Sequence, residues 1–240
     1  MFSQAVADAW FTPYGQGQTL VDNETCRIVV NPDAQHSHTT HFMAPPEQRV
    51  QILVGEQAAE RIAPIPQGAT VQDVQDALKT AGAETDEADR IHVYLPAALV
   101  GLRDQDAVRV LTQDDAEAFA RFEAAADPDE LDEAYVELDH WCVMGVFDGD
   151  ELVAATSAYP WRESKLADIG VITRASHRRR GLAVQMVHAI SREIVKRGYE
   201  PMYRAGVSND ASAGVALAAG MTRIGVWQQF RFGDGESVEQ

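Results

Sequence analysis

The chain has 240 residues and a formal net charge of −17, which is enough sequence for one large domain or two small ones. Its 45% apolar and 24% charged content are those of an ordinary globular protein. The negative charge argues against nonspecific nucleic-acid binding. No run approaches the roughly 18 apolar residues of a membrane span. We therefore expect neither a nucleic-acid nor a membrane partner.

The N-terminal stretch, residues 1–11, contains Asp8 and lacks the basic and apolar regions of a secretion signal. Cys26 and Cys142 are the only cysteines and form no C-x-x-C pair, which favours reduced thiols over a disulfide framework. These features predict a cytoplasmic protein. The sequence leaves a homodimer open.

The first hundred residues indicate a small α+β unit whose role stays open. The expected elements are strands at 25–30, 50–54 and 90–95 and a helix at 70–81. A loop between the first two strands contains His36, His38 and His41, a spacing that could bind a metal. Because no cysteine or carboxylate stands nearby at ligand spacing, a polar surface loop is the better interpretation, and we predict no metal site.

Residues 97–105 form the predicted boundary, which gives an N-terminal domain at 1–103 and a second domain at 104–240. The second domain should open with a strand at 108–111. A helix capped by Thr112 should follow, and Pro128 should end that helix. The further expected elements are a helix at 129–138, a hairpin at 141–159 turning at Asp148-Gly149-Asp150, strands at 169–173 and 201–207, a helix led by Asn209, and an antiparallel pair at 221–232.

The most informative stretch runs from Ile169 to Gly198. A β-rich apolar strand at 169–173 is followed by a basic loop at 174–180, and a helix then begins at Gly181. Four apolar residues spaced four apart give that helix one hydrophobic face: Leu182, Met186, Ile190 and Ile194.

A strand that leads through a short loop into a helix N-terminus directs several free N–H groups at one spot, and this favours phosphate binding. Gly181 and the small Ala183 would let a pyrophosphate approach the backbone, and Arg178, Arg179 and Arg180 add charge suited to phosphate oxygens. The loop fits neither the nucleoside triphosphate nor the dinucleotide pattern.

The loop does fit R-x-x-G-x-A, which resembles the [QR]-x-x-G-x-[GA] loop of the GNAT family of N-acetyltransferases. About thirty residues later Asn209, Gly220 and Met221 are similar to that family's N-x-x-A-x-x-x-Y-x-x-x-G-F signature. The resemblance covers roughly residues 107–232. Two positions depart from the pattern: Ser212 replaces a small alanine, and Ala216 stands where many members place a tyrosine that protonates the departing thiolate.

The resemblance implies an α/β fold with a mixed central sheet flanked by helices, in which two central parallel strands splay apart and admit the pantetheine arm of acetyl-CoA. It implies acetyl transfer from acetyl-CoA, the co-substrate, to a primary amine in a ternary complex. The cofactor-binding residues implied are Val171, Ile172, Thr173, Arg178, Arg179, Arg180, Gly181, Leu182, Ala183 and Asn209.

Direct transfer requires a base for the ammonium proton and an acid for the thiolate. Asp168 is our first candidate base, followed by Glu133 and Glu137. Ser212 lies one helical turn before Ala216 and is the first candidate acid. The alternatives for the acid are Tyr203, Tyr159 and water.

Charge is distributed unevenly in the second domain. Residues 112–139 contain eleven Asp/Glu and one Arg, whereas residues 168–206 contain eight Lys/Arg and three Asp/Glu. If the acidic block borders the acceptor side of the cleft, it predicts a small cationic acceptor; the plain alternative is a solvated surface. A different class of function, a non-catalytic acyl-CoA-binding sensor, is motivated by Ala216. A third, a nucleic-acid patch at Arg178–Arg180, is disfavoured by the overall charge.

Overall fold

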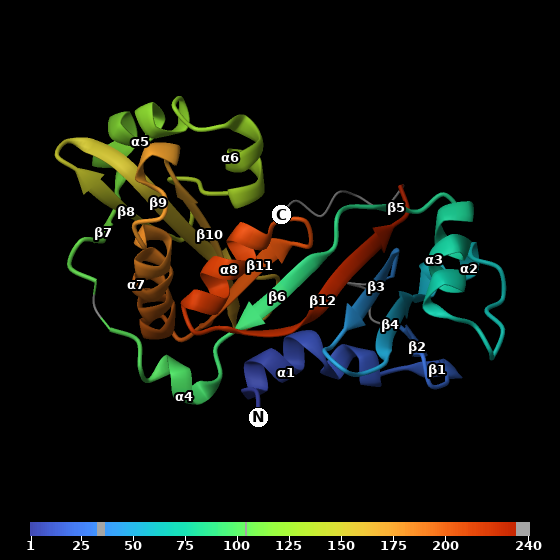
Figure 1. Ribbon diagram of the computed structural model, residues 1–240. Helices are drawn as coiled ribbons and strands as arrows, with labels where there is room; N and C mark the ends of the chain where they lie inside the picture. Colours follow the sequence, from blue (N-terminus) through green and yellow to red (C-terminus); the bar gives the residue numbers. More distant parts are fainter. Residues whose placement is uncertain (33–36, 104, 234–240) are drawn as a thin grey trace. The chain divides into compact units, whose positions relative to one another are not determined.

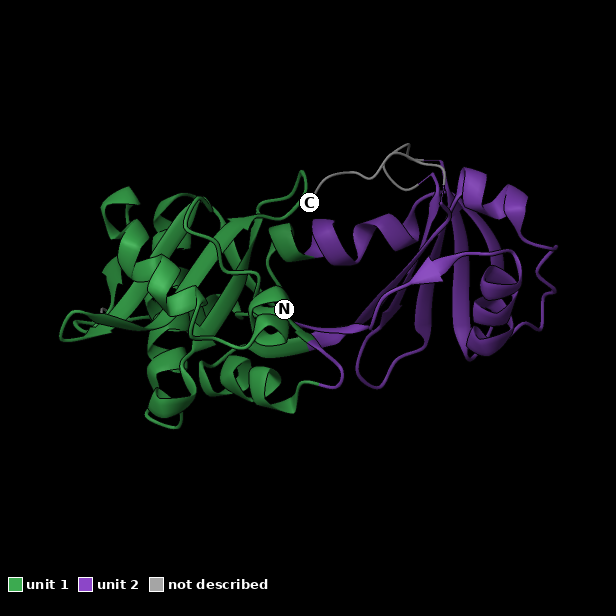
Figure 2. Cartoon of the chain, turned by 90° about the horizontal axis from the view of Figure 1, so that it is seen from above, with its two compact units in different colours: residues 1–6, 92–205, 209–223 green, residues 7–91, 206–208, 224–240 purple. Residues whose placement is uncertain are grey.

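The computed structural model describes residues 1–32, 37–103 and 105–233, and the chain forms two compact units (Figure 2). Unit 1 consists of Met1–Val6, His92–Ala205 and Asn209–Arg223, and unit 2 of Ala7–Ile91, Gly206–Ser208 and Ile224–Gln240. The division differs from a single boundary at 103/104 over four stretches. Residues 1–6 and 92–103 belong to unit 1, and residues 206–208 and 224–240 belong to unit 2.

Unit 1 contains a mixed sheet in the order β7-β8-β9-β10-β11 (Figure 1). Its strands are β7 (Arg109–Val110), β8 (Cys142–Asp148), β9 (Glu151–Pro160), β10 (Leu166–Thr173) and β11 (Glu200–Gly206). Neighbours are antiparallel except β10 and β11, which are parallel. The β8–β9 hairpin turns at Gly149, whose φ of 61° is the left-handed conformation that the Asp-Gly pair predicts.

Helices cover both faces of this sheet, so the predicted mixed α/β architecture is confirmed. They are α4 (Pro96–Leu99), α5 (Ala116–Glu123), α6 (Pro128–Ala134), α7 (Leu182–Lys196) and α8 (Asp210–Ala218). Side chains alternate along β10: Ala167 and Ile169 enter the core beneath α7 and α8, whereas Ile172 enters the core beneath α5. Successive residues of this one strand therefore face the two sides of the site.

The helix α7 forms as its apolar spacing predicts. Met186, Ile190 and Ile194 are fully buried, and Leu182 is half-buried at the first turn. The helix ends at Lys196, and Gly198 follows with a φ of 78°.

The strands of unit 2 pair in the order β1-β2-β4-β3-β12, with β5 on β12. Its elements are β1 (Gln18–Asp22), β2 (Cys26–Asn31), β3 (Thr39–Ala44), β4 (Val50–Gly55), α2 (Glu56–Arg61), α3 (Val71–Thr80) and β5 (Glu84–Thr85). The elements α1 (Gln4–Trp10), β6 (Asp89–Val93) and β12 (Thr222–Arg231) have residues in both units. Thr70 caps α3 through a reciprocal capping box with Asp73, as its sequence predicts.

Three local predictions differ from the structure. The helix expected at 129–138 ends at Ala134, because Tyr135 adopts a left-handed φ of 44°. Residues 221–232 form one long strand, β12, which pairs with β3 and β5 instead of folding back on itself. The histidine loop includes the strand β3, in which His41 bonds Thr39 and Trp227; His36 lies outside the described residues.

Within the described residues, no helix combines the length and apolar character that crossing a membrane requires.

Candidate active site

The loop between β10 and α7 has the backbone geometry of an anion site. Gly181 occupies the N-cap position of α7 with a φ of 78°, and Arg179 is also left-handed with a φ of 60°. Among the described residues, no side chain caps the start of the helix, so its first N–H groups are available. A Cβ on Gly181 would meet only the Gln185 Nε2 atom, at 4.0 Å. The space in front of this glycine is therefore open to a ligand.

The arginines of the loop are exposed but partly engaged. The Arg178 guanidinium donates from Nε to the Thr173 carbonyl at 3.0 Å and also pairs with Glu130 of α6. Arg180 donates to the Ser176 carbonyl at 3.2 Å. A pyrophosphate at the start of α7 would compete with Glu130 for Arg178. The side chain of Leu182 packs against the core cluster that contains Met186.

Strands β10 and β11 splay apart. They pair only over Leu166–Asp168 and Glu200–Met202, whereas β10 continues to pair with β9 as far as Thr173. Residues 169–173, which include Val171, Ile172 and Thr173, therefore have no β11 partner on that side. This is the opening that the resemblance predicts for the pantetheine arm, because free main-chain N–H groups along it can hydrogen-bond a carbonyl.

Asn209 and Ser212 lie at the start of α8, beside this opening. Asn209 accepts from the Ser212 N–H at 2.8 Å, which caps the helix, and donates from Nδ2 to Glu133 Oε1 at 2.6 Å. The Ser212 hydroxyl lies 3.0 Å from that of Tyr203 on β11. Ala216 is fully buried in the core.

Asp168 is buried and paired. Its Oδ2 atom accepts from Arg204 Nε at 2.7 Å and from the Tyr159 hydroxyl at 3.2 Å, and its side chain is only 6% exposed. Its Oδ1 atom is also buried, and no described group bonds it. Arg204 in turn lies over the Trp161 ring, 4.3 Å from its centroid. Burial, with the Asp168 charge as the second cause, raises the pKa of Tyr159.

His140 joins this group, although no sequence pattern singled it out. Its Nδ1 atom lies 2.8 Å from the Ser157 Oγ atom, and its ring contacts those of Tyr135 and Tyr159 at centroid distances of 4.8 and 5.0 Å. Its Nε2 atom is 3.7 Å from the Glu137 carboxylate. Burial lowers the pKa of His140, against the smaller raising effects of Glu137 and Asp139.

The structure thus brings together two groups of predicted residues, one at each side of the splay. The cofactor loop and the start of α8 meet through α6, whose Glu130 and Glu133 contact Arg178 and Asn209 respectively. Asp168 lies with His140 and Tyr159 on the β9–β10 face beneath α6. Glu137 is half-exposed at the edge of this group.

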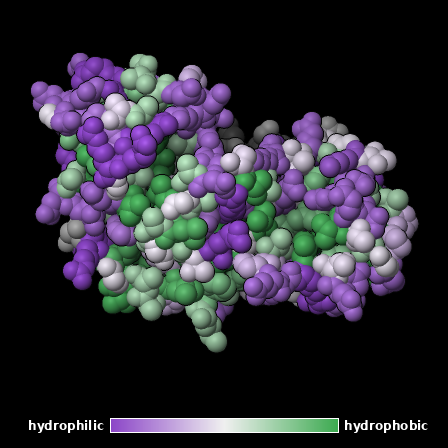
Figure 3. Space-filling view, viewed as in Figure 1, coloured by the Kyte–Doolittle hydropathy of each residue, from purple (hydrophilic) through white to green (hydrophobic). Residues whose placement is uncertain are grey.

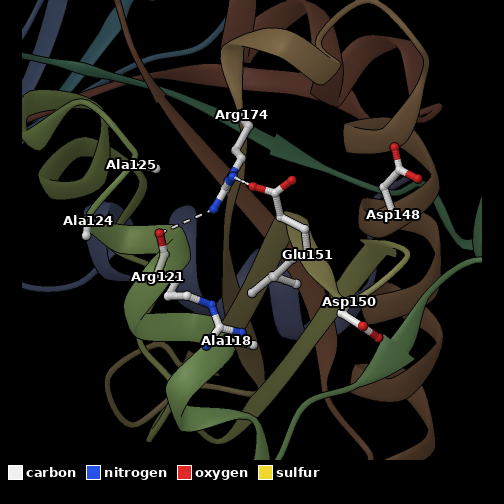
Figure 4. Close-up of a pocket in the computed structure, with 9 residues that line it drawn as sticks. Ala118, Arg121, Ala124, Ala125, Asp148, Asp150, Glu151 and Arg174 are labelled. Atoms are coloured by element: carbon white, nitrogen blue, oxygen red, sulfur yellow. Dashed lines mark hydrogen bonds and ion pairs between the residues drawn. The ribbon is translucent and has the colours of Figure 1, made fainter.

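A separate open hollow lies between α5 and the β8–β9 hairpin (Figure 4). Arg121, Glu151 and Arg174 line it, and Arg174 pairs with Glu151 and donates to the Arg121 carbonyl at 3.2 Å. None of the predicted site residues lines this hollow.

The order of elements from β7 to β12 and the splay of β10 from β11 are those expected of the GNAT fold. Residues 143–229 match the family model described as FR47-like protein, within the region that resembles the GNAT family, so that resemblance is confirmed.

Similar solved structures include a GNAT-family acetyltransferase from Colwellia psychrerythraea, with 21% identity, coverage of 69% of this chain and 63% of that chain, and a TM-score of 0.48. A GCN5-related N-acetyltransferase from Kribbella flavida has 15% identity, coverage of 68% and 65%, and a TM-score of 0.47. Each match spans less than two thirds of the GNAT protein's own length.

A functionally unknown protein from Staphylococcus epidermidis is similar over 94% of this chain and 96% of that chain, with 11% identity and a TM-score of 0.48. No curated protein matches the sequence.

Proposed function

We propose that the protein is an N-acetyltransferase that moves the acetyl group of acetyl-CoA to a primary amine of a small cationic acceptor, by direct attack in a ternary complex. The observation that carries the proposal is the unpaired stretch of β10 beyond Asp168, which leads directly to the uncapped N-terminus of α7 behind Gly181. The unpaired stretch of β10 offers a slot for the pantetheine arm, and the N-terminus of α7 offers an anion site for the pyrophosphate.

In this proposal the pyrophosphate binds the N–H groups from Gly181 onward, with Arg178, Arg179 and Arg180 around it. Main-chain N–H groups near Val171 hold the thioester carbonyl and stabilise the oxyanion that forms on attack. Positioning of the two substrates can supply about 7–11 kcal/mol of the barrier reduction, so no covalent enzyme intermediate is needed.

Asp168 remains part of the proposed site, but its ion pair with Arg204 leads us to assign it a role other than that of the base. The Oδ2 atom of Asp168 already accepts from Arg204 and Tyr159, whereas its Oδ1 atom, which no described group bonds, can accept a hydrogen bond from an ammonium group. We therefore assign Asp168 to holding the acceptor amine. The thiolate receives its proton from the Ser212–Tyr203 hydroxyl pair.

The acidic helices favour a cationic acceptor. Residues 112–139 carry eleven carboxylates and one arginine, and α5 and α6 lie on the sheet face that Asp168 shares. Figure 3 shows hydrophilic residues gathered over these two helices. The pKa of Glu123 is raised, first by burial and second by repulsion from Glu137, which is consistent with a dense negative field there.

Calorimetry with the Gly181→Glu variant tests the cofactor site. The new side chain places bulk and negative charge at the pyrophosphate, so the affinity for acetyl-CoA should fall at least tenfold, about 1.4 kcal/mol. Gly220→Glu is the matched control, because Gly220 has a similar φ of 84° and open space around its Cβ position. Equal affinities of the two variants would remove the loop from the cofactor site.

A turnover assay separates the enzyme from the non-catalytic sensor, the second candidate, which Ala216 favours. Release of free thiol from acetyl-CoA is followed with a polyamine, an aminoglycoside, a neutral amine and an acidic amino acid. Transfer to at least one amine supports the enzyme, whereas acetyl-CoA binding without transfer to any of them supports the sensor.

A further inference from the structure

We propose that His140 is the base that takes the proton from the acceptor ammonium, and that Ser157 holds its ring in the tautomer that can do so. This inference rests on the proposed acetyltransferase function and adds to it a residue that the sequence signatures do not contain.

The hydrogen bonds around the ring define its tautomer. Ser157 is fully buried on β9, and its hydroxyl donates to the Tyr135 carbonyl at 3.4 Å. We assign the hydroxyl proton of Ser157 to the Tyr135 carbonyl, so that the Ser157 oxygen accepts from His140 Nδ1–H, 2.8 Å away. The proton of the neutral ring is thereby fixed on Nδ1, and Nε2 keeps its lone pair for a proton acceptor role.

The position of the ring fits the reaction. Ser157 is the cross-strand partner of Gly170, which directly precedes Val171, where the thioester carbonyl is expected. Tyr159, two residues along the same face of β9, contacts the His140 ring and donates to Asp168. Tyr159 thus links Asp168 to His140, and in this proposal an amine held at Asp168 Oδ1 passes its proton to the imidazole directly or through one water.

The carboxylates around the site are less suited to this step. Asp168 is paired with Arg204, and Glu133 accepts from Asn209 at 2.6 Å. Glu137 is 51% exposed on its side chain and lies 3.7 Å from His140 Nε2. That placement suits it to stabilise the imidazolium once the proton has arrived.

The charges that face the ring have opposing effects on its titration. Glu137 and Asp139 from its own segment favour the imidazolium, and Asp168 and Arg204 from β10 and β11 face it across Tyr159 as a compensated pair. Tyr135 and Tyr159 cover the ring and remove it from water. Desolvation is the largest effect and lowers the pKa of His140, so the ring is neutral and able to accept a proton at neutral pH.

The proton balance is complete without any further reactant. The ammonium gives one proton to His140 Nε2, and the free amine attacks the thioester carbon. A C–N bond forms, the C–S bond breaks, and the Ser212–Tyr203 pair gives a proton to the thiolate. The second nitrogen proton passes through solvent water to that hydroxyl pair and restores it. His140 then releases its proton to solvent past Glu137.

The pH dependence of kcat/KM in the His140→Gln variant tests the inference, with acetyl-CoA saturating. Near neutral pH we expect a loss of about 100-fold. The wild-type rate should reach its plateau below pH 7, because a neutral His140 deprotonates the ammonium. The variant should instead climb with pH until the acceptor amine itself loses its proton. His188→Gln is the matched control, since His188 on α7 bonds the Ala219 carbonyl, and it should keep the wild-type profile.

Three further measurements distinguish a failure of the role proposed for His140 from a failure of the proposed acetyltransferase function. Calorimetric affinity for acetyl-CoA should be unchanged in His140→Gln, and nitrogen-15 NMR of the wild type should show the proton on Nδ1. Ser157→Ala should mix the tautomers and lower kcat/KM partially, which keeps a test available if His140→Gln fails to fold. A wild-type pH profile in His140→Gln, or a proton on Nε2, overturns the role of His140 alone. Absence of turnover by the wild type with every amine overturns the proposed function and this inference with it.

Discussion

On α8 the residue at position 216 is an alanine whose side chain is fully buried in the core of unit 1. One turn earlier on α8, the Ser212 hydroxyl lies 3.0 Å from the hydroxyl of Tyr203 on β11. Burial raises the pKa of Tyr203 to about 12. The phenol therefore stays protonated at all working pH values and can donate to a thiolate through Ser212.

Tyr203→Phe should lower kcat by about 10- to 100-fold while leaving the affinity for acetyl-CoA unchanged, because only the donated proton is lost. The diagnostic measurement is the dependence on the leaving group. An acetyl thioester of a more acidic thiol needs less protonation, so it should recover most of the lost rate in the variant. If both donors are slowed equally, Tyr203 acts in packing and not in proton transfer.

The sequence predicts those site residues whose environment is formed by their neighbours in the chain. Arg178 and Gly181 could be assigned from the loop because a helix N-terminus and a left-handed glycine are features of adjacent residues. His140 could not, because its environment is made by Ser157, Tyr135 and Tyr159, which only the hairpin and α6 bring together. The sequence predicted Asp168 as a site residue. It did not predict the ion pair with Arg204, because Arg204 lies 36 residues away on another strand.

The C-terminal end of α6 determines where Tyr135 lies in the candidate site. The helix stops at Ala134, whose carbonyl would lie only 2.0 Å from a Cβ at position 170 of β10. Gly170 therefore allows the last turn of α6 to lie directly on the strand. That contact places Tyr135, and through its carbonyl Ser157, beside His140.

Gly170→Ala should destabilise the protein by about 1–3 kcal/mol, because a methyl group cannot occupy the space of a backbone carbonyl without moving α6. Gly214→Ala on α8 is the matched control, since its Cβ would meet nothing within 4 Å. In the interior of a helix that change should stabilise by about 0.5–1 kcal/mol. Thermal unfolding followed by circular dichroism measures both. Equal melting temperatures for the two variants would contradict the close contact.

Element types were easier to predict than their partners. The β8–β9 hairpin and α7 follow from an Asp-Gly turn and a four-residue apolar spacing, which are properties of short segments. The strand β12 was expected to pair within 221–232, yet it pairs with β3, which lies about 180 residues earlier in the chain. Such pairing depends on which edge is available after folding, and no local pattern encodes it.

The protein has a negative net charge, but its acidic and basic residues are concentrated in different segments. The net charge is −17, yet residues 168–206 carry eight Lys/Arg against three Asp/Glu. Within unit 1, the acidic α5 lies over one face of the sheet and α7, which follows the basic loop, over the other. An anionic donor and a cationic acceptor would thus be attracted to different sides of the same splay.

The salt dependence of kcat/KM for the acceptor tests this division. Exposed charges act over about one Debye length, ~8 Å at physiological ionic strength, so their attraction for a polyamine should weaken as salt is added. We expect kcat/KM for a polyamine to fall by about tenfold between low and high salt, for a neutral amine to stay constant, and for an acidic amino acid to rise from a low value. Acetyl-CoA is kept saturating at each salt concentration, so that screening of its own phosphates does not enter the comparison. A preference for acidic acceptors, or a polyamine rate indifferent to salt, would leave the acidic helices as a solvated surface without a role in acceptor choice.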